Sequence, residues 1–221
     1  PPINLIFETF SLSSDKIQFK MNIEFKISKK PVLYDDAIKF LEKKVKKVKR
    51  GGREFIWILE HPTTFTGGIR YKKSEILDKS IRIKSTNRGG KITLHNPGQK
   101  IVYFAINLNK RKKNIRNLIN QIENIIINFL KIYGVEANSD RKNIGIWIKN
   151  KKIAAIGIRV SRWVAYHGFS ININNNLKKY KAIIPCGIKN RGVTNLREIK
   201  DQNYKELKNI LIKNFISNLE N

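Results

Sequence analysis

The sequence predicts an α+β fold, with mixed and antiparallel sheets and about three long helices. Two observations indicate this class. Apolar strand-like runs outnumber helical stripes, and they often follow one another directly instead of alternating with helices, as they would in a doubly wound sheet. Hydrophobic residues recur at helical spacing in three long stretches, which sets the expected number of long helices.

Strands are expected where apolar residues alternate with polar ones or run together. Residues 144–148 and 153–158 flank a polar stretch from Lys149 to Lys152, and this arrangement predicts a hairpin. Residues 161–173 continue with strand character. The remaining strands are expected at 21–27, 55–59 and 101–108.

Three segments carry the helical stripes. The first starts near Pro31 and is ended by Gly51 and Gly52. The second spans 115–130, with Gly134 placed to cap its end, and the third spans 207–219. The lysines of the first segment lie mostly off its apolar stripe. This placement favours the solvent-facing side of a packed helix over a nucleic-acid-binding arm.

Length and composition indicate a single domain. The 221 residues, 41% of them hydrophobic, are enough to fill one core. The sequence has no uncharged apolar run of about 18 residues, so no membrane-spanning helix is expected. Residues 1–20 lack the basic start and the long apolar stretch of a secretory signal. We therefore expect an N-terminal extension over 1–20 and one domain over 21–221.

The charge has two interpretations. Lys+Arg 45 against Asp+Glu 17 gives a net charge of +28, which is typical of proteins with acidic or nucleic-acid partners. The excess is nevertheless spread along the chain, and Lys, Asn and Ile are all frequent. A compositional bias that fills solvent-exposed positions accounts for the charge equally well.

Cys186 is the one cysteine of the chain, and it lies between Pro185 and Gly187. An intramolecular disulfide is therefore excluded, which fits a reducing compartment. Buried structural cysteines usually lie within apolar strands or helices. A thiol on a proline–glycine turn can instead be presented to a substrate. Spacing alone leaves a passive cysteine and a reactive one both open.

The three histidines do not predict a metal site. His61, His95 and His167 are far apart in the sequence, and no second cysteine accompanies them. Each lies in a loop or at a strand end, where functional and structural histidines both occur. The sequence has no Walker A or GxGxxG pattern, so neither ATP nor a dinucleotide is indicated.

Five motifs occur in a fixed order and together carry a resemblance. They are EHP at 60–62, RGGKITLHNPGQ at 88–99, KIAAIGIR at 152–159, YHGFSININ at 166–174 and PCG at 185–187. From Met21 to about Leu196, this set resembles the octanoyltransferase of lipoate biosynthesis, the lipoyl(octanoyl) transferase family. The resemblance implies a biotin/lipoate protein ligase-like fold, which is consistent with the α+β class.

The resemblance also implies an activity. A cytoplasmic acyltransferase would move an octanoyl group from octanoyl-acyl carrier protein to a lysine of a lipoyl domain, without a cofactor or a metal. The implied acceptors are the lipoyl domains of 2-oxoacid dehydrogenase complexes and the glycine cleavage H protein. Neither nucleic acid nor a membrane is an implied partner. Residues 21–221 would form the single catalytic domain.

The resemblance assigns two kinds of site residue. Cys186 is implied to carry the acyl group as a thioester, with Lys152 as its catalytic partner. The implied substrate-binding residues are Arg88, Gly89, Gly90, Lys91, Ile92, Thr93, Leu94, His95, Ala155, Ile156, Gly157, His167, Gly168, Phe169 and Ser170.

Departures from the family pattern leave the shape of the substrate loop open. Leu94 and Asn96 stand where the family usually has tyrosine and glycine, and Gly67-Gly68 replace a leucine–glycine pair. The sequence leaves two rival functions open. An ATP-dependent lipoate-protein ligase of the same fold needs no acyl-carrying thiol, so the PCG motif argues against it. A non-catalytic basic nucleic-acid-binding protein would be indifferent to Cys186→Ala and would bind in a salt-sensitive manner.

The first 20 residues are expected to be dispensable. The matched region opens at Met21, and the preceding segment shows neither strand alternation nor a helical stripe. We expect a chain that begins at Met21 to keep its activity and its free energy of unfolding to within about 0.5 kcal/mol. Thermal unfolding and an octanoyl-transfer assay measure this. An insoluble or inactive truncated protein would show the segment to be structural.

Overall fold

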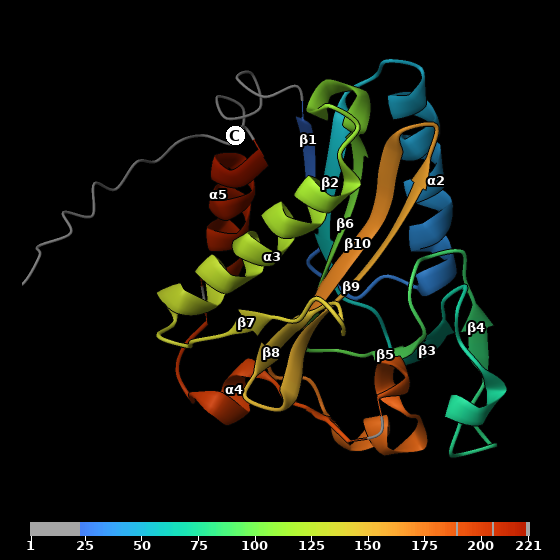
Figure 1. Cartoon of the computed structure of the whole chain (residues 1–221), viewed down its shortest axis with the longest axis vertical. Helices are drawn as coiled ribbons and strands as arrows, with labels where there is room; N and C mark the ends of the chain where they lie inside the picture. The colour runs from blue at the N-terminus through green and yellow to red at the C-terminus, as the bar shows by residue number, and fades with distance from the viewer. Residues whose placement is uncertain (1–22, 189, 205, 220–221) are drawn as a thin grey trace, which may run out of the picture.

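The computed structural model describes residues 23–188, 190–204 and 206–219 (Figure 1). Residues 1–20, expected to be an extension, lie outside this range. The fold is α+β, as predicted. A main sheet with the strand order β1-β2-β6-β10-β9-β8-β7 carries β11 beside β9, and a small sheet has the order β4-β3-β5. None of the helices among the described residues is long and apolar enough to cross a membrane.

The main sheet contains β1 Ile23–Ile27, β2 Glu54–Leu59, β6 Gln99–Asn107, β7 Asn138–Ser139, β8 Ile146–Ile148, β9 Lys151–Ser161, β10 Val164–Asn172 and β11 Gly192–Val193. The small sheet contains β3 Thr64–Gly67, β4 Ile83–Ser85 and β5 Ile92–His95. The α-helices are α2 Tyr34–Lys49, α3 Ile115–Ile132, α4 Leu196–Ile199 and α5 Leu207–Leu219. Short 3-10 helices are η1 Lys73–Glu75, η2 Leu108–Arg111, η3 Lys178–Ala182 and η4 Pro185–Gly187.

The main sheet is largely antiparallel, with two parallel pairs. Strand β10 lies between β6 and β9 and pairs antiparallel with both. The parallel pairs are β1 with β2 and β11 with β9. The mixed directions confirm the expected sheet type. They also bring the segment that follows the cysteine turn back beside the strand that carries Lys152.

Strand alternation sends neighbouring side chains to two separate cores. On one face, Phe55 and Trp57 of β2 pack with the apolar stripe of α2. On the other face, Ile56 and Ile58 of the same strand belong to a larger cluster with α3 and α5. Helix α2 therefore covers one face of the main sheet, and α3 and α5 cover the other (Figure 1).

Helix ends follow the sequence signals. Gly51 has φ +87° and follows the C-cap residue of α2, and Gly134 has φ +70° and follows the C-cap residue of α3. Both are the left-handed conformation that a glycine adopts at a helix C-terminus. At the start of α3, the Asn114 side chain accepts a hydrogen bond from the Asn117 N–H at 2.9 Å. This cap satisfies a free backbone donor of the first turn.

One expected strand is shorter than predicted. Residues 161–173 were expected to form a continuous strand, but Ser161 ends β9 and β10 begins only at Val164. Arg162 and Trp163 form a tight turn, with φ values of 49° and 59°. Positive φ at two residues that are neither Gly nor Asn gives no turn signal in the sequence.

Candidate active site

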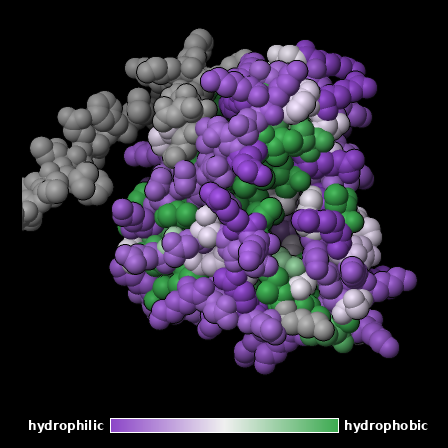
Figure 2. Space-filling model, in the orientation of Figure 1, coloured by the Kyte–Doolittle hydropathy of each residue, from purple (hydrophilic) through white to green (hydrophobic). Residues whose placement is uncertain are grey.

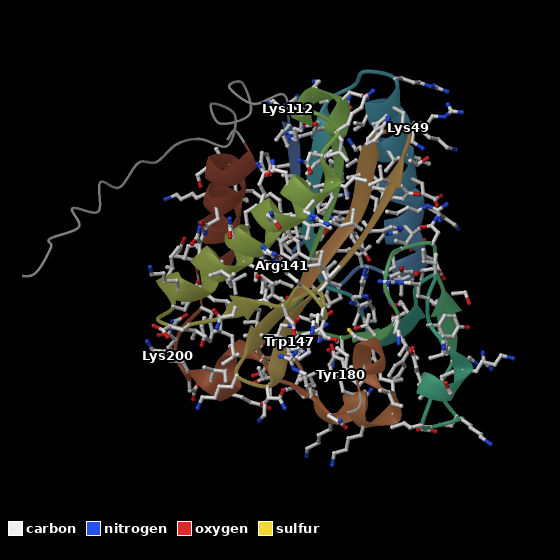
Figure 3. All side chains as sticks on the ribbon, viewed as in Figure 1. Lys49, Lys112, Arg141, Trp147, Tyr180 and Lys200 are labelled. Carbon is white, nitrogen blue, oxygen red and sulfur yellow. The ribbon has the colours of Figure 1, made fainter. Side chains whose placement is uncertain are left out.

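A cavity of about 590 Å³ opens beside β9 and β10. Its wall is built by the 88–95 segment, by the middle of both strands, by the loop before β8 and by the η4 turn. Figure 2 shows hydrophobic residues running down the middle of the face that carries α3, between hydrophilic flanks. In Figure 3, Trp147 and Tyr180 lie in the lower half of the molecule, and Arg141 lies above them at about mid-height.

Cys186 lines this cavity from a turn, as expected. Its residue is partly exposed, and its thiol forms no disulfide. Cys186 has φ +57° and Gly187 has φ +66°. A left-handed conformation at a residue with a side chain costs about 1–3 kcal/mol, and such strain occurs chiefly at functional sites. The Gly187 N–H donates to the Ile184 carbonyl at 2.9 Å, and the Ile188 N–H donates to Pro185 at 3.1 Å.

Lys152 lines the same cavity from the second residue of β9. It is buried, and Nζ donates a hydrogen bond to the Ile144 carbonyl at 3.0 Å. The ammonium also lies 4.6 Å from the centre of the Trp147 ring, within cation–π range. Within the described ranges, Lys152 forms no ion pair with a carboxylate. The ammonium is therefore held without a neutralising anion.

The chain that follows Cys186 is fixed to the strand that carries Lys152. In the parallel pair, Val193 of β11 lies opposite Lys152. The Thr194 N–H donates to the Lys152 carbonyl at 3.0 Å, and the Gly192 N–H donates to Asn150 at 3.2 Å. Cys186 and Lys152 also share a small pocket with Thr93. The hydrogen bond of the Lys152 ammonium is to Ile144, so a direct bond to the thiol stays a prediction.

The Arg88-Gly89-Gly90 segment packs backbone to backbone on β9. A Cβ built on Gly89 would lie 2.6 Å from the Ile158 carbonyl oxygen, so a larger residue cannot fit. The Arg88 guanidinium donates to Thr66 O and Oγ1, both at 2.9 Å, and to its neighbour's carbonyl at 3.0 Å. Burial lowers the Arg88 pKa. Arg88 thus fixes this loop.

His95 is held neutral beneath the cavity. Its Nδ1–H donates to Gln99 Oε1 at 2.7 Å, because the Gln99 amide nitrogen donates elsewhere, to Asn172 Oδ1 at 2.8 Å. Burial, and then the proximity of His61, lowers the pKa of His95 to about 3. His95 is therefore uncharged at physiological pH. His61 Nδ1–H donates to a backbone carbonyl at 2.6 Å and does not line the cavity, so it is structural.

His167 is strained and buried, and it reaches the cavity wall. It has φ +67° within β10, and its Nε2 lies 2.5 Å from Asn87 Oδ1. Burial lowers its pKa to about 3, and the positive charges of Arg88 and Arg159 act in the same direction. The ring is thus neutral at physiological pH, and its Nδ1 is a buried acceptor without a hydrogen-bond partner among the described residues.

The cavity brings together nearly all the residues that the resemblance implied. Both proposed catalytic residues line it, and so do all the implied substrate-binding residues except Leu94, which is fully buried in the core of the small sheet. The sequence motifs did not indicate the other lining residues, which are Arg70, Ile101, Tyr103, Ile115, Ile119, Arg141, Lys142, Asn143, Ile144, Ile158, Val160, Gly187 and Ile188. The exposure of apolar side chains such as Ile115 and Ile144 marks them as cavity-lining residues, but this exposure is visible only in the structure.

The fold is that of the lipoate and biotin protein ligases. A solved structure of lipoate-protein ligase A bound with ATP superposes with a TM-score of 0.74, covering 90% of this chain and 86% of that one, at 16% identity. Protein Ta0514 of T. acidophilum, a putative lipoate protein ligase with bound lipoic acid, gives a TM-score of 0.72, also at 16% identity. Likeness at such low identity shows the fold alone.

Sequence comparison narrows this class to a family. The model of the lipoyl protein ligase A/B catalytic domain matches residues 34–216. The octanoyltransferase of Wolbachia sp. subsp. Brugia malayi is 40% identical over 201 residues, 87% of this chain and 98% of the relative. That of Ehrlichia chaffeensis is 42% identical over 184 residues, 80% of this chain and 86% of the relative. The chain belongs to the lipoyl protein ligase A/B catalytic domain family, among its octanoyltransferases. The predicted family, fold and enzyme class are confirmed.

Proposed function

We propose that this enzyme transfers an octanoyl group from a carrier thioester to a protein lysine through a thioester on Cys186. The observation that carries the proposal is the shared cavity of Cys186 and Lys152, one on a strained turn and the other buried without an anion. A strained nucleophile beside a buried cation is an arrangement typical of acyl-transfer sites. The thiol must stay reduced, which favours the cytoplasm as the compartment.

The chemistry requires two steps. The first exchanges one thioester for another, and the second converts the thioester into an amide. The Cys186 thiolate attacks the carbonyl carbon of the donor, the donor carbon–sulfur bond breaks, and the released carrier thiol takes up a proton. The amine of the acceptor lysine then attacks the Cys186 thioester, an amide forms, and the Cys186 thiol leaves. No ATP is required, because the donor is already a thioester.

Lys152 has a different task in each step. As an ammonium it stabilises the attacking thiolate of Cys186. A free lysine amine is a minor species near neutral pH, so the acceptor needs a base, and Lys152 serves once it has lost its proton. Backbone N–H groups near Lys152 or Cys186 hold the oxyanion. The N–H groups of Gly187 and Ile188 are already used within the turn.

The donor and acceptors follow from the family. Octanoyl-acyl carrier protein is the proposed donor, and the lipoyl domains of 2-oxoacid dehydrogenase complexes and the H protein are the proposed acceptors. The described residues lining the cavity include several cations but no carboxylate, and this lining is suited to acidic partners. The cations are Arg70, Arg88, Lys91, Arg141, Lys142 and Lys152.

The test of the proposal is the intact mass of the protein after incubation with octanoyl-acyl carrier protein. We expect one added octanoyl group, removable by hydroxylamine, and transfer to a lipoyl domain when one is added. The chain has one cysteine, so the modified residue is unambiguous. Transfer of free octanoate that depends on ATP, without a protein-bound thioester, would instead support the rival ligase activity.

The transfer rate is expected to fall as salt rises. The charge of +28 and the cations at the cavity act at a distance on acidic partners, and salt screens this attraction. Between low and physiological ionic strength, the second-order rate constant of octanoylation should fall about three- to tenfold. Stopped-flow or quenched-flow assays with the carrier protein measure this. A rate that does not change would show that the charge is compositional.

Two matched double variants show which positive charges cause the salt dependence of the transfer rate. Arg141→Gln together with Lys142→Gln removes two exposed charges at the cavity and should flatten the salt dependence. Lys39→Gln together with Lys43→Gln removes the same charge from the exposed side of α2. We expect this second pair of changes to leave the slope nearly unchanged, because screening weakens charges more than about 10 Å from the partner.

A further inference from the structure

The turn that carries Cys186 rests on an ion pair whose carboxylate is buried. A Cβ built on Gly187 would lie 2.3 Å from Lys91 Nζ and 2.5 Å from Glu75 Oε1. Such contacts are closer than real atoms come, so any larger residue at this position would have to displace the Lys91 and Glu75 side chains. The backbone of the turn is in direct contact with both charged groups.

Glu75 and Lys91 form this ion pair, with Nζ and Oε1 3.0 Å apart. The Glu75 side chain is only 6% exposed, whereas that of Lys91 is 36% exposed and lines the cavity. A buried carboxylate requires such a partner, because an unpaired one costs several kcal/mol. The pair therefore holds a fixed position beneath Gly187.

Backbone bonds connect the Glu75 segment to the turn from the other side. The Ile184 N–H donates to the Glu75 carbonyl at 2.8 Å. Ile76 and Ile183 form an antiparallel bridge, and the Leu77 N–H donates to the Ala182 carbonyl at 2.9 Å. Helix η1 is thus paired with the chain entering the nucleophile turn, although about 110 residues separate them in sequence.

The pair joins three segments at one point. Glu75 belongs to η1, Lys91 directly precedes β5, and Gly187 belongs to η4. The Lys91 carbonyl also accepts a hydrogen bond from Gly68 N–H at 3.1 Å, which fixes the segment that carries this lysine. Neither Glu75 nor its contact with Gly187 was indicated by the sequence motifs.

We propose that Glu75 is a positioning residue, whose ion pair with Lys91 holds the Cys186–Gly187 turn in its left-handed conformation and so aims the thiol into the cavity. Glu75 does not touch the acyl group. The inference rests on the proposed function in one respect, since it takes Cys186 as the nucleophile. Without the pair, the turn relaxes from its strained conformation, and the sulfur leaves its productive position.

The test uses Glu75→Gln in the full chain, a change that removes the charge and keeps the shape. We expect the maximal rate of Cys186 octanoylation to fall at least about tenfold, with little change in half-saturation by the donor, because displacement of a reacting atom by about 1 Å costs up to about 100-fold. We also expect amide hydrogen exchange at Gly187 and Ile188 to accelerate at least about tenfold, because their bonds within the turn open more often.

Glu54→Gln is the matched control. Glu54 is equally buried and forms a bidentate pair with Arg111, but neither residue lines the cavity. Its loss should lower the melting temperature and leave the octanoylation rate and the exchange of Gly187 unchanged. Equal effects of both variants on these measurements would show that Glu75 acts through global stability alone, which overturns the proposal. So would unchanged exchange or an unchanged maximal rate in Glu75→Gln.

A second variant keeps the test decisive if Glu75→Gln does not fold. Lys91→Gln removes the same ion pair from its more exposed partner, and faster exchange at Gly187 and Ile188 is its decisive result, because Lys91 also lines the cavity and its loss affects octanoylation directly. Hydrogen exchange also separates this inference from the proposed function. A wild-type protein that takes up no octanoyl group would refute the proposed function, while the exchange at Gly187 would still report whether Glu75 holds the turn.

Discussion

Replacing Cys186 by Ser is expected to reduce octanoyl transfer at least about a thousandfold. A serine hydroxyl stays protonated and is a weak nucleophile without a dedicated base, whereas a thiol near neutral pH supplies some thiolate. Lys152, which lines the same cavity, already donates its hydrogen bond to the Ile144 carbonyl. Transfer from octanoyl-acyl carrier protein to a lipoyl domain, followed by mass spectrometry, measures the loss.

The control for this substitution is a measurement of the melting temperature, which reports whether the fold is kept. Cys186 lies on a partly exposed turn, and Ser is nearly the same size, so the melting temperature should change little. The variant should also fail to form the hydroxylamine-sensitive adduct. A Cys186→Ser protein that keeps near-normal transfer would refute the thioester intermediate and favour direct transfer to the acceptor lysine.

Replacing Lys152 by Met is expected to slow both half-reactions, by about 10²- to 10⁴-fold in the overall transfer. This range is typical of the loss of a positioned general acid or base. Methionine fills the space beside Trp147 without the ammonium. Alkylation of Cys186 by iodoacetamide should slow as well, because the thiolate loses a stabilising charge. Rapid-quench measurements of enzyme octanoylation and of acceptor octanoylation resolve the two steps.

Lys151→Met is the matched control for this prediction. Lys151 is the adjacent residue of β9, and it is exposed where Lys152 is buried. Loss of a charge at this position should leave both half-reactions close to those of the unchanged enzyme. If both variants slow transfer equally, the effect arises from the general positive field, and Lys152 has no special role.

Much of the fold was predictable because its core elements are strongly periodic. The stripe of α2, the continuous apolar run of β2 and the hairpin of β8 and β9 all follow from residue spacing. The turn at Arg162 and Trp163 was not predictable in the same way. Its residues are not turn formers, and the antiparallel pairing of β9 with β10 fixes their conformation.

The candidate site was predictable only in part. Ordered motifs pointed to Cys186, Lys152 and the 88–95 segment, but no spacing rule connects Glu75 with Gly187. Such contacts depend on how distant segments meet in the fold. The acceptor of the Lys152 hydrogen bond is likewise a backbone carbonyl, that of Ile144, which any residue type provides. A backbone carbonyl that accepts a hydrogen bond cannot be recognised from the sequence.

The pairing of β11 with β9 limits how far the chain between the cysteine turn and β11 can vary in length. Val193 is registered opposite Lys152, and η4 ends at Gly187, so both ends of this connection are held in place. Adding or deleting one residue there would either shift Val193 by one position, reversing its side chain, or pull the cysteine turn out of line. Surface loops usually accept such changes. We therefore expect substitutions to be tolerated in this connection far better than insertions or deletions.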